Sequence, residues 1–214
     1  MIEGKVIIAF AYAEPQGRYT WSDLKTTAKK DGAGYVLNGH KAVVIGAPWA
    51  SHLIVTARTG GERRDRSGVS VFVLAKDTPG VTTRDYVTVD GRRASEVYFE
   101  NVAVGADALI GVEGEGLALI ELVTDEAIAA LCAEACGAMK VAHAMTVEYS
   151  RQRKQFGVPI GSFQALQHRM ADLLLEVEQA RSAVINAAAA VDDTDRTARE
   201  RALSAAKYSV GRIG

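Results

Sequence analysis

The pattern of hydrophobic and polar positions along the chain changes once, near residue 112. Before that point, short runs rich in Val and aromatic residues alternate with clusters of Gly, Pro and Asp, as in β-strands joined by turns. The strand candidates are "YVLNGHKAVVIG", "HLIVTAR", "GVSVFVLA" and "SEVYFENVAV", and the central Asn-Gly of the first predicts a hairpin. Because no helix-length pattern separates these runs, they predict an antiparallel β-barrel or sandwich.

After "GVEGEG" the hydrophobic period becomes that of an α-helix. Apolar residues recur from Leu117 to His143, a second pattern runs through Tyr149, and a third extends from Phe163 to about Val191. A fourth helix is expected after the Asp-Asp-Thr-Asp cap signal. The predicted fold class is therefore α+β, with a β-domain at 1–112 and part of an antiparallel helical bundle at 113–214. Since the last pattern is still helical where the chain stops, we expect this bundle to be incomplete.

Charge and cysteine content indicate a protein of the cytoplasm. The chain has 25 basic and 26 acidic residues, which gives no general field for nucleic acid or an anionic membrane. Its N-terminal apolar run is too short to span a bilayer. The two cysteines, Cys132 and Cys136, have a helical spacing that disfavours a disulfide. We expect a cytoplasmic protein with reduced thiols, no metal site, and no nucleic-acid or membrane partner.

The segment "RTGGERRDRSG", residues 58–68, is polar, charged and rich in glycine. A charged run of this kind is most simply a solvated face of the molecule. We therefore expect a solvated hairpin loop here rather than a basic binding site.

The stretch "RQRKQFGVPIGSFQ", residues 151–164, gathers donors beside a break in the helical pattern. In one interpretation, its cations form a solvated helix end, where positive charge complements the helix dipole. In the other, an arginine fork grips a pyrophosphate while Phe156 and Gln164 flank an aromatic ring or a ribose. The residues alone leave both interpretations open.

The longer stretch "YSRQRKQFGVPIGSFQALQHRMADL" resembles the Tyr-x3-Arg-x2-Phe-Gly-x2-Ile-x2-Phe-Gln segment of the acyl-CoA dehydrogenase family. These flavoproteins oxidise the Cα–Cβ bond of a CoA thioester. "AEPQG", "YVLNGHKAVVIGA" and "YFENVAVGADALIGVEGEG" resemble the family's flavin loop, its Gly-x-Lys hairpin and its entry into the C-terminal helices. The resemblance implies a middle β-domain and the first part of a C-terminal α-domain. It thus implies an incomplete chain of a flavin-dependent acyl-CoA dehydrogenase.

Transferred residue by residue, the resemblance implies an FAD site. Arg153 would meet the pyrophosphate, Gln155 and Phe156 the ribityl chain and flavin edge, and Gln164 the adenosine half. In the family this motif reaches an FAD held mainly by a neighbouring subunit, so a homo- or hetero-oligomer, a dimer or tetramer, is implied. The other implied partners are an acyl-CoA substrate and electron-transferring flavoprotein.

The β-domain departs from the family pattern at the flavin. The loop threonine is Ala13, the hairpin aromatic is Val43, and the hydroxyl residue near flavin N5 is Ile45. The Gly-Ser-Asp that follows the loop aligns with Arg18, Tyr19 and Thr20. The sequence of the C-terminal half is most similar to the pimeloyl-CoA dehydrogenase small-subunit type. The alternative function is therefore a non-catalytic subunit of a heteromeric acyl-CoA dehydrogenase, which clamps the FAD of its partner.

No residue matches a catalytic base of the family. In some members the base is a glutamate on the first long C-terminal helix, and that position falls at Ala127. Glu126 is one residue away, but one helical step turns a side chain by about 100°. We expect the base beyond residue 214, with Glu126 as the other candidate.

Overall fold

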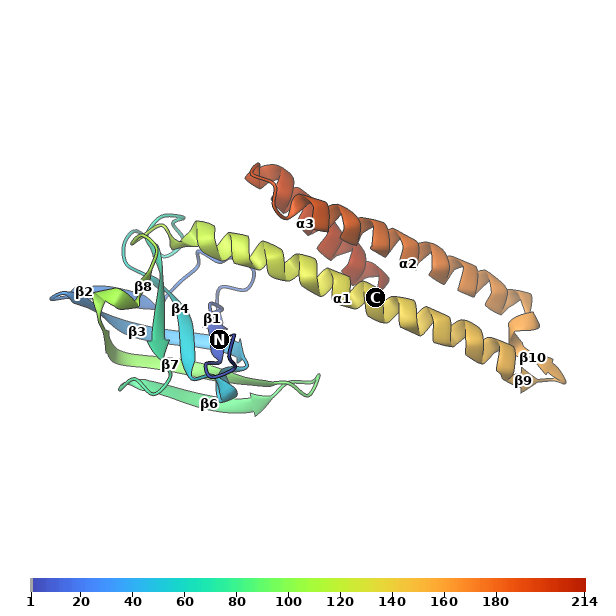
Figure 1. Cartoon of the computed structure of the whole chain (residues 1–214), viewed down its shortest axis with the longest axis horizontal. Coiled ribbons are helices and arrows are strands. Elements are labelled where there is room, and N and C mark those ends of the chain that lie inside the picture. Colours follow the sequence, from blue (N-terminus) through green and yellow to red (C-terminus); the bar gives the residue numbers. More distant parts are fainter. Residues whose placement is uncertain (1) are drawn as a thin grey trace. The chain divides into compact units, whose positions relative to one another are not determined.

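The computed structural model describes residues 2–214, which form two compact units. The units are Met1–Glu121, built mainly of β-strands, and Leu122–Gly214, built mainly of helices (Figure 1). The predicted α+β class is thus confirmed. The predicted domain boundary at residue 112 stays a prediction, because helix α1 begins at Gly116 in the first unit and continues into the second.

The first unit contains one mixed β-sheet. Its strands are β1 (Ile8–Ala11), β2 (Thr27–Asp31), β3 (Gly34–Ile45), β4 (His52–Arg58), β5 (Val69–Ala75), β6 (Val81–Val87), β7 (Arg93–Val104) and β8 (Leu109–Ile110). Their order is β6-β7-β3-β2-β4-β5-β8, and β1 pairs with β4. Short 3₁₀ turns, η1 (Ala47–Trp49) and η2 (Ala106–Ala108), follow β3 and β7.

The predicted antiparallel barrel is not confirmed, because the sheet is mixed and is not closed. The strand order ends at β6 and β8, which do not pair with each other. Both β1 and β2 pair with β4 in parallel, β1 along His52–Val55 and β2 at Arg58. The chain between them, residues 12–26, leaves the sheet and returns to the same edge of β4. Sequence periodicity could not reveal this excursion, because it depends on pairing between distant strands.

The predicted Asn-Gly hairpin was also wrong, since β3 is one twelve-residue strand. Asn38 and Gly39 lie where the register between β3 and β7 shifts. A Cβ atom at Gly39 would lie 2.6 Å from the Cα of Thr26. Glycine is needed here for the close approach of two backbones and not for a turn. The hairpin of this region instead joins β2 to β3, with Asp31 opposite Gly34.

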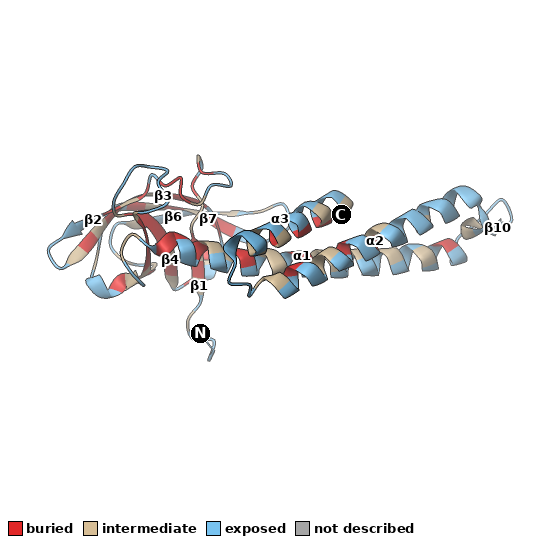
Figure 2. Cartoon of the chain, turned by 90° about the horizontal axis from the view of Figure 1, so that it is seen from above, coloured by how far each residue is buried: buried red, intermediate tan, exposed pale blue. Residues whose placement is uncertain are grey.

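The core of the β unit lies on the inner faces of its strands. Its fully buried members include Leu37, Leu53, Val55, Phe72, Val97 and Val102. Figure 2 shows buried residues, in red, along the strands of this unit, mixed with less buried ones. The largest fully buried side chain, however, is that of Lys41. A buried lysine requires a partner, which leads to the candidate site.

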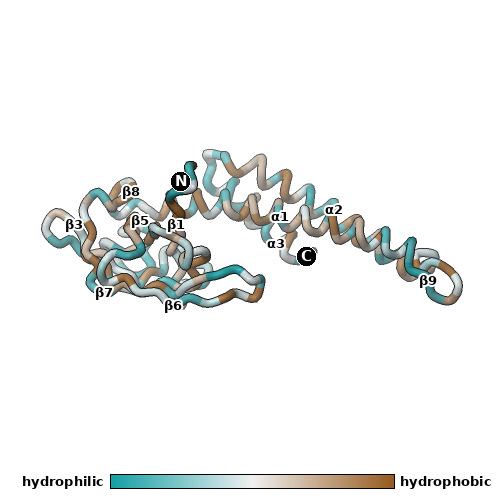
Figure 3. The backbone as a smooth tube through the Cα atoms, turned by 60° about the horizontal axis from the view of Figure 1, so that its bottom comes forward, coloured by the Kyte–Doolittle hydropathy of each residue, from teal (hydrophilic) through white to brown (hydrophobic). Residues whose placement is uncertain are grey.

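The second unit consists of three helices and one small hairpin. Its elements are α1 (Gly116–Gln152), β9 (Lys154–Gln155), β10 (Val158–Pro159), the 3₁₀ turn η3 (Ile160–Ser162), α2 (Gln164–Ala190) and α3 (Arg196–Ile213). The first two predicted helical patterns therefore form a single helix. Hydrophobic residues recur along α1 and α2, as Figure 3 shows.

Specific contacts hold α3 against the other helices of this unit. The predicted cap is confirmed, because the Asp195 carboxylate accepts hydrogen bonds from the backbone N–H groups of Thr197 and Ala198. Arg199 donates to Asp125 of α1 over 2.9 Å. The apolar core of the unit comprises Cys132, Ala180, Ala187, Leu203, Ala206 and Val210.

Candidate functional site

The donor-rich stretch after α1 folds into a tight hairpin. Gln155 of β9 pairs with Val158 of β10, and Phe156 and Gly157 connect them. Both connecting residues have left-handed backbone, with φ of 53° and 81°. This is the signature of a two-residue type I′ turn, in which Gly157 is the favoured residue type and Phe156 is not.

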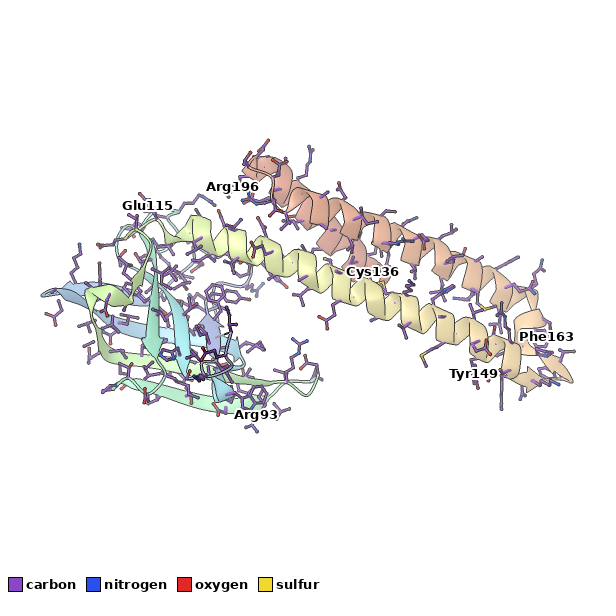
Figure 4. The ribbon with its side chains drawn as sticks, viewed as in Figure 1. Arg93, Glu115, Cys136, Tyr149, Phe163 and Arg196 are labelled. Carbon is purple, nitrogen blue, oxygen red and sulfur yellow. The ribbon has the colours of Figure 1, made fainter. Side chains whose placement is uncertain are left out.

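Phe156 is held in a conformation that is costly for its residue type. A non-glycine residue in the left-handed region costs about 1–2 kcal/mol. The side chain is nevertheless 93% exposed. Its ring meets the edge of the Phe163 ring, with ring centroids 6.2 Å apart. In Figure 4, Phe163 and Tyr149 mark this end of the helical unit. Strain combined with an exposed aromatic ring suggests a binding role for the turn.

The structure brings three of the four predicted cofactor residues close to one another in the hairpin. Arg153, Gln155 and Phe156 are consecutive or nearly so, and all are exposed. The backbone N–H of Arg153 bonds to Tyr149 O, and its carbonyl accepts from Ile160 N, both over 2.8 Å. These bonds tie the end of α1 to the turn η3.

Gln164, the fourth predicted residue, is the first residue of α2 and is also exposed. It follows η3, which the Arg153 carbonyl fixes to the end of α1. One guanidinium, two amides and an aromatic ring thus lie on short segments joined by hydrogen bonds. Such a set can hold an anionic ligand that carries a planar ring.

In the β unit, the loop that contains Ala13 lies beside the bulge of β3. Ala42 N donates to Ala13 O over 2.9 Å. Val43 lies within a register shift of β3, has φ of 52° and is 53% exposed. Ile45 is 45% exposed. The three side chains at the family's flavin contacts are therefore aliphatic and cannot bond to a flavin. The hairpin of the helical unit fits an FAD, whereas these β-unit side chains lack the polar groups expected for one.

A buried ion pair between Glu14 and Lys41 holds the loop of residues 12–26 in place. Lys41 Nζ donates to Glu14 Oε1 over 2.7 Å and to Thr56 Oγ1 over 2.9 Å. The other groups bonded to the Glu14 carboxylate belong to its own loop. It accepts from the backbone N–H groups of Lys25 and Thr26 over 2.7 and 3.1 Å, so the carboxylate supports the backbone amides of its own loop. The excursion from the sheet is therefore folded around one carboxylate.

Burial and the ion pair act in opposite directions on the pKa of each partner. Burial lowers the pKa of Lys41 to about 8, although the Glu14 charge and hydrogen bond act in the opposite direction. Burial raises the pKa of the Glu14 carboxyl, but Lys41, Thr26 and Gln16 outweigh it, and the pKa ends below its usual value. Sequence reasoning missed this pair. Its one signal was a lysine inside the apolar run of β3, opposite Val97.

The candidate base Glu126 is exposed on α1, and so is Ala127. The neighbouring Asp125 is buried, but it is engaged by Arg199. Glu126 therefore stays a prediction. Among residues 2–214, no group of three His, Cys, Asp or Glu side chains is arranged to hold a metal ion. None of the described helices is long and apolar enough to cross a membrane.

Comparison with known proteins covers both units. The model of the acyl-CoA dehydrogenase middle domain matches residues 9–102, and that of the acyl-CoA dehydrogenase C-terminal domain matches residues 114–214. The short-chain specific acyl-CoA dehydrogenase of Megasphaera elsdenii is 33% identical over 192 residues, which is 88% of this chain and 50% of the relative. Isovaleryl-CoA dehydrogenase of Oryza sativa subsp. japonica, a mitochondrial protein, is 33% identical over 196 residues, 90% of this chain and 48% of the relative. The chain spans about half the length of the curated relatives it matches.

Solved structures show the same fold. Butyryl-CoA dehydrogenase from Megasphaera elsdenii has a TM-score of 0.88 at 30% identity, covering 99% of this chain and 56% of that chain. A structure described as PigA with FAD and proline has a TM-score of 0.92 at 30% identity, covering 99% and 55%.

Proposed function

The chain belongs to the acyl-CoA dehydrogenase family, and from this premise we propose that it forms part of an FAD-dependent dehydrogenase acting on acyl-CoA thioesters. Two similar structures, at 30% and 31% identity, are described as containing FAD or as FAD-dependent. Relatives are described as dehydrogenases of short-chain acyl-CoA and of isovaleryl-CoA. The class of thioester follows from these relatives, whereas the length of the acyl chain does not. The pimeloyl-CoA type stays a prediction.

The observation that carries the proposal is the hairpin at the end of α1. Arg153 would bind the FAD pyrophosphate, since its planar fork matches two phosphate oxygens at once. Gln155 and Phe156 would meet the ribityl chain and the flavin edge, and Gln164 the adenosine half. The strained turn at Phe156 supports this assignment, because a solvated helix end gains nothing from an exposed aromatic ring in left-handed backbone.

In the proposed reaction, a carboxylate removes the α-proton of the acyl thioester. FAD, when bound, supplies the acceptor for the hydride from the β-carbon. Hydrogen bonds to the thioester carbonyl would stabilise the developing enolate. The base is a glutamate that we expect outside this chain, with Glu126 as the candidate within it. Electron-transferring flavoprotein would then reoxidise the cofactor, and one similar structure carries that protein in its description.

The alternative function is a non-catalytic subunit in a heteromeric enzyme. Ala13, Val43 and Ile45 favour it, because an aliphatic surface forms no hydrogen bond to a flavin in the β unit. In that arrangement the hairpin would clamp an FAD held by a partner chain. In either arrangement the protein functions as an oligomer, since the hairpin addresses the cofactor of a neighbouring subunit.

Arg153→Ala in the full-length assembly tests the proposal. It removes a charge-assisted bond worth about 1.5–3 kcal/mol, so the FAD affinity should fall roughly tenfold to hundredfold. Arg151→Ala is the matched control, because Arg151 lies in the last turn of α1 and is also exposed. FAD retained per protein after gel filtration is the measurement. Equal retention in both variants would return Arg153 to the role of a solvated helix end.

The amount of flavin per chain distinguishes the two candidate functions. The absorbance spectrum of the full-length protein, alone and with its partner chain, gives this amount. One FAD per chain in the protein alone supports the catalytic function. FAD that appears only with the partner, at half the number of chains, supports the clamping subunit.

A further inference from the structure

The bulge of β3 sets two residues against one residue of β7. The ladder between the two strands holds at Lys41 and again at Val44, with a register shift between them. Two residues of β3 lie inside this shift, Ala42 and Val43, whereas β7 contributes only Glu96. Backbone N–H groups inside a bulge leave the regular ladder, so they need acceptors elsewhere.

Both of these N–H groups have an acceptor outside the ladder. Ala42 N donates to Ala13 O over 2.9 Å. The hydroxyl of Tyr86 accepts from the backbone N–H of Val43. Burial and a hydrogen bond to Glu96 raise the pKa of Tyr86, and the bond from Val43 acts in the opposite direction. Because β7 lies between β6 and β3 (Figure 1), the Tyr86 side chain crosses β7 to reach the bulge.

Glu96 and His40 hold the Tyr86 hydroxyl in place. Glu96 Oε1 accepts from Tyr86 OH over 3.0 Å, and Glu96 Oε2 lies 2.5 Å from His40 Nε2. The His40 ring stacks on Tyr98, with ring centroids 4.4 Å apart and an interplanar angle of 11°. The Glu96 side chain is only 13% exposed. Since each carboxylate oxygen has a partner, the Tyr86 proton stays directed at Glu96, and the hydroxyl oxygen can accept from Val43.

Val43 needs an external bond because its own backbone conformation is unfavourable. Its φ is 52°, which a β-branched residue rarely adopts. Strained residues of this kind persist only where the surrounding structure over-determines them. The aliphatic side chain of Val43 forms no hydrogen bond that would hold it against a ligand. The direction of the bulge is therefore set by other groups of the protein, and Tyr86 bonds Val43 directly.

We propose that Tyr86 is a positioning residue for the bulge, supported by Glu96 and His40, and that it sets how Val43 faces a bound flavin. The part that concerns the flavin rests on the proposed function, in which Val43 and Ile45 occupy the family's flavin contacts. Tyr86 acts through the backbone N–H of Val43 without touching the cofactor. Loss of its hydroxyl would leave this N–H without its acceptor and allow the bulge to shift.

The first test follows hydrogen exchange of the Val43 amide in the ¹⁵N-labelled chain by NMR. Tyr86→Phe keeps the ring and removes the acceptor, so this amide should exchange about five- to tenfold faster. Tyr98→Phe is the matched control, since it removes a hydroxyl from β7 and keeps the ring that stacks on His40. Exchange at the buried Leu53 corrects for any change in global stability, which a purely structural role of Tyr86 would alter.

Variants of Glu96 test the support of the tyrosine. Glu96→Gln keeps an oxygen that can accept from Tyr86, whereas Glu96→Leu does not. Exchange at Val43 should therefore be faster in Glu96→Leu than in Glu96→Gln, by about threefold or more. Equal rates in the two variants would show that Glu96 does not act through the Tyr86 hydroxyl.

The second test uses the absorbance spectrum of FAD bound to the full-length assembly. Tyr86→Phe should shift the flavin band, and Tyr98→Phe should leave it unchanged. Identical bands in the two variants would overturn the effect on the flavin, and identical Val43 exchange would overturn the positioning role. Absence of bound FAD from the native assembly would overturn the proposed function and with it the effect on the flavin, while exchange at Val43 still decides whether Tyr86 positions the bulge.

Discussion

Val43 shows how a single residue can occupy a backbone conformation that its type disfavours. A β-branched residue in the left-handed region is an outlier, and Val43 has φ of 52° while half its side chain faces solvent. The register shift between Lys41 and Val44 imposes this conformation. The bulge is therefore specified by its surroundings, above all by the bond from Ala42 N to Ala13 O, and not by the residue that occupies it.

Replacing Val43 by Asn should stabilise the protein. Asn tolerates left-handed backbone, so the unfolding free energy should rise by about 1 kcal/mol. Urea denaturation is the measurement. Val36→Asn on the same strand is the control, since Val36 is half-buried and has no positive φ, and it should lower stability. A loss of similar size in both variants would show that Val43 is not strained.

Lys41 predicts an unusual dependence of stability on pH. Its pKa is about 8 in the folded chain and near 10.5 in the unfolded chain. Between these values the unfolded chain holds a proton that the folded chain has lost, so the unfolding free energy should rise with pH. The stabilisation is absent below pH 8 and complete above pH 10.5.

Guanidinium denaturation from pH 7 to pH 10 measures this effect. Glu14→Gln/Lys41→Met removes both charges and retains the titrations of all other groups. The difference between the native chain and this double variant should therefore grow with pH, in favour of the native chain. Parallel curves would mean that Lys41 keeps its ordinary pKa inside the core.

At the scale of elements, the local sequence pattern was sufficient to predict those strands and helices whose own residues define them. The predicted run "HLIVTAR" is β4 itself, and the Asp195 cap starts α3 where the sequence indicated. β6 was missed because "VTTRDYV" is polar and mostly exposed and pairs with β7 along one edge only. The Asn-Gly of β3 misled for another reason. Its glycine allows the close approach of Thr26, the residue before β2, which no local pattern encodes.

Gly39→Ala tests that contact. A Cβ atom 2.6 Å from Thr26 Cα forces two backbones apart, so the unfolding free energy should fall by about 2–3 kcal/mol. Gly60→Ala is the control, because a Cβ atom at Gly60 has no heavy atom within 4 Å. Thermal and urea unfolding of both variants provide the measurement. If Gly39→Ala were as stable as Gly60→Ala, the close approach to Thr26 would not require a glycine at position 39.

At the scale of the whole molecule, the candidate site was predictable only where the sequence keeps the family's residues. The stretch around Arg153 could be singled out because its donors are contiguous and match a long motif. The pair of Glu14 and Lys41 was not found, since its members are 27 residues apart and each has an ordinary identity. Arg58 and Asp23, whose buried side chains bond the exposed loop between β4 and β5, were missed for the same reason. These charged residues hold the structure together because they are buried. Their burial depends on the fold and cannot be read from the local sequence.

The 214-residue chain alone should not oxidise acyl-CoA and should hold FAD poorly. Ala127 lacks the carboxylate that a catalytic base requires. The aliphatic side chains of Ala13, Val43 and Ile45 lack the polar and aromatic groups that contact the flavin in the family. Octanoyl-CoA and pimeloyl-CoA, assayed with added FAD and an artificial electron acceptor, provide the measurement, and the full-length assembly is the positive control. Flavin-dependent turnover above a blank without protein would place both base and flavin loop within this chain.

The carboxylate of Glu14 binds main-chain amides, and this has a consequence for how the loop of residues 12–26 can vary. Two of its hydrogen bonds go to the N–H groups of Lys25 and Thr26, which every residue type except proline provides. The anchor is therefore indifferent to most side chains that the loop presents to a ligand. Positions such as Tyr19 and Thr20, which are exposed and have no positive φ, can be randomised in a library while Glu14 and Lys41 keep the course of the loop. Under the proposed function, selectivity for new thioesters can thus be sought by mutation in this loop with the sheet left intact.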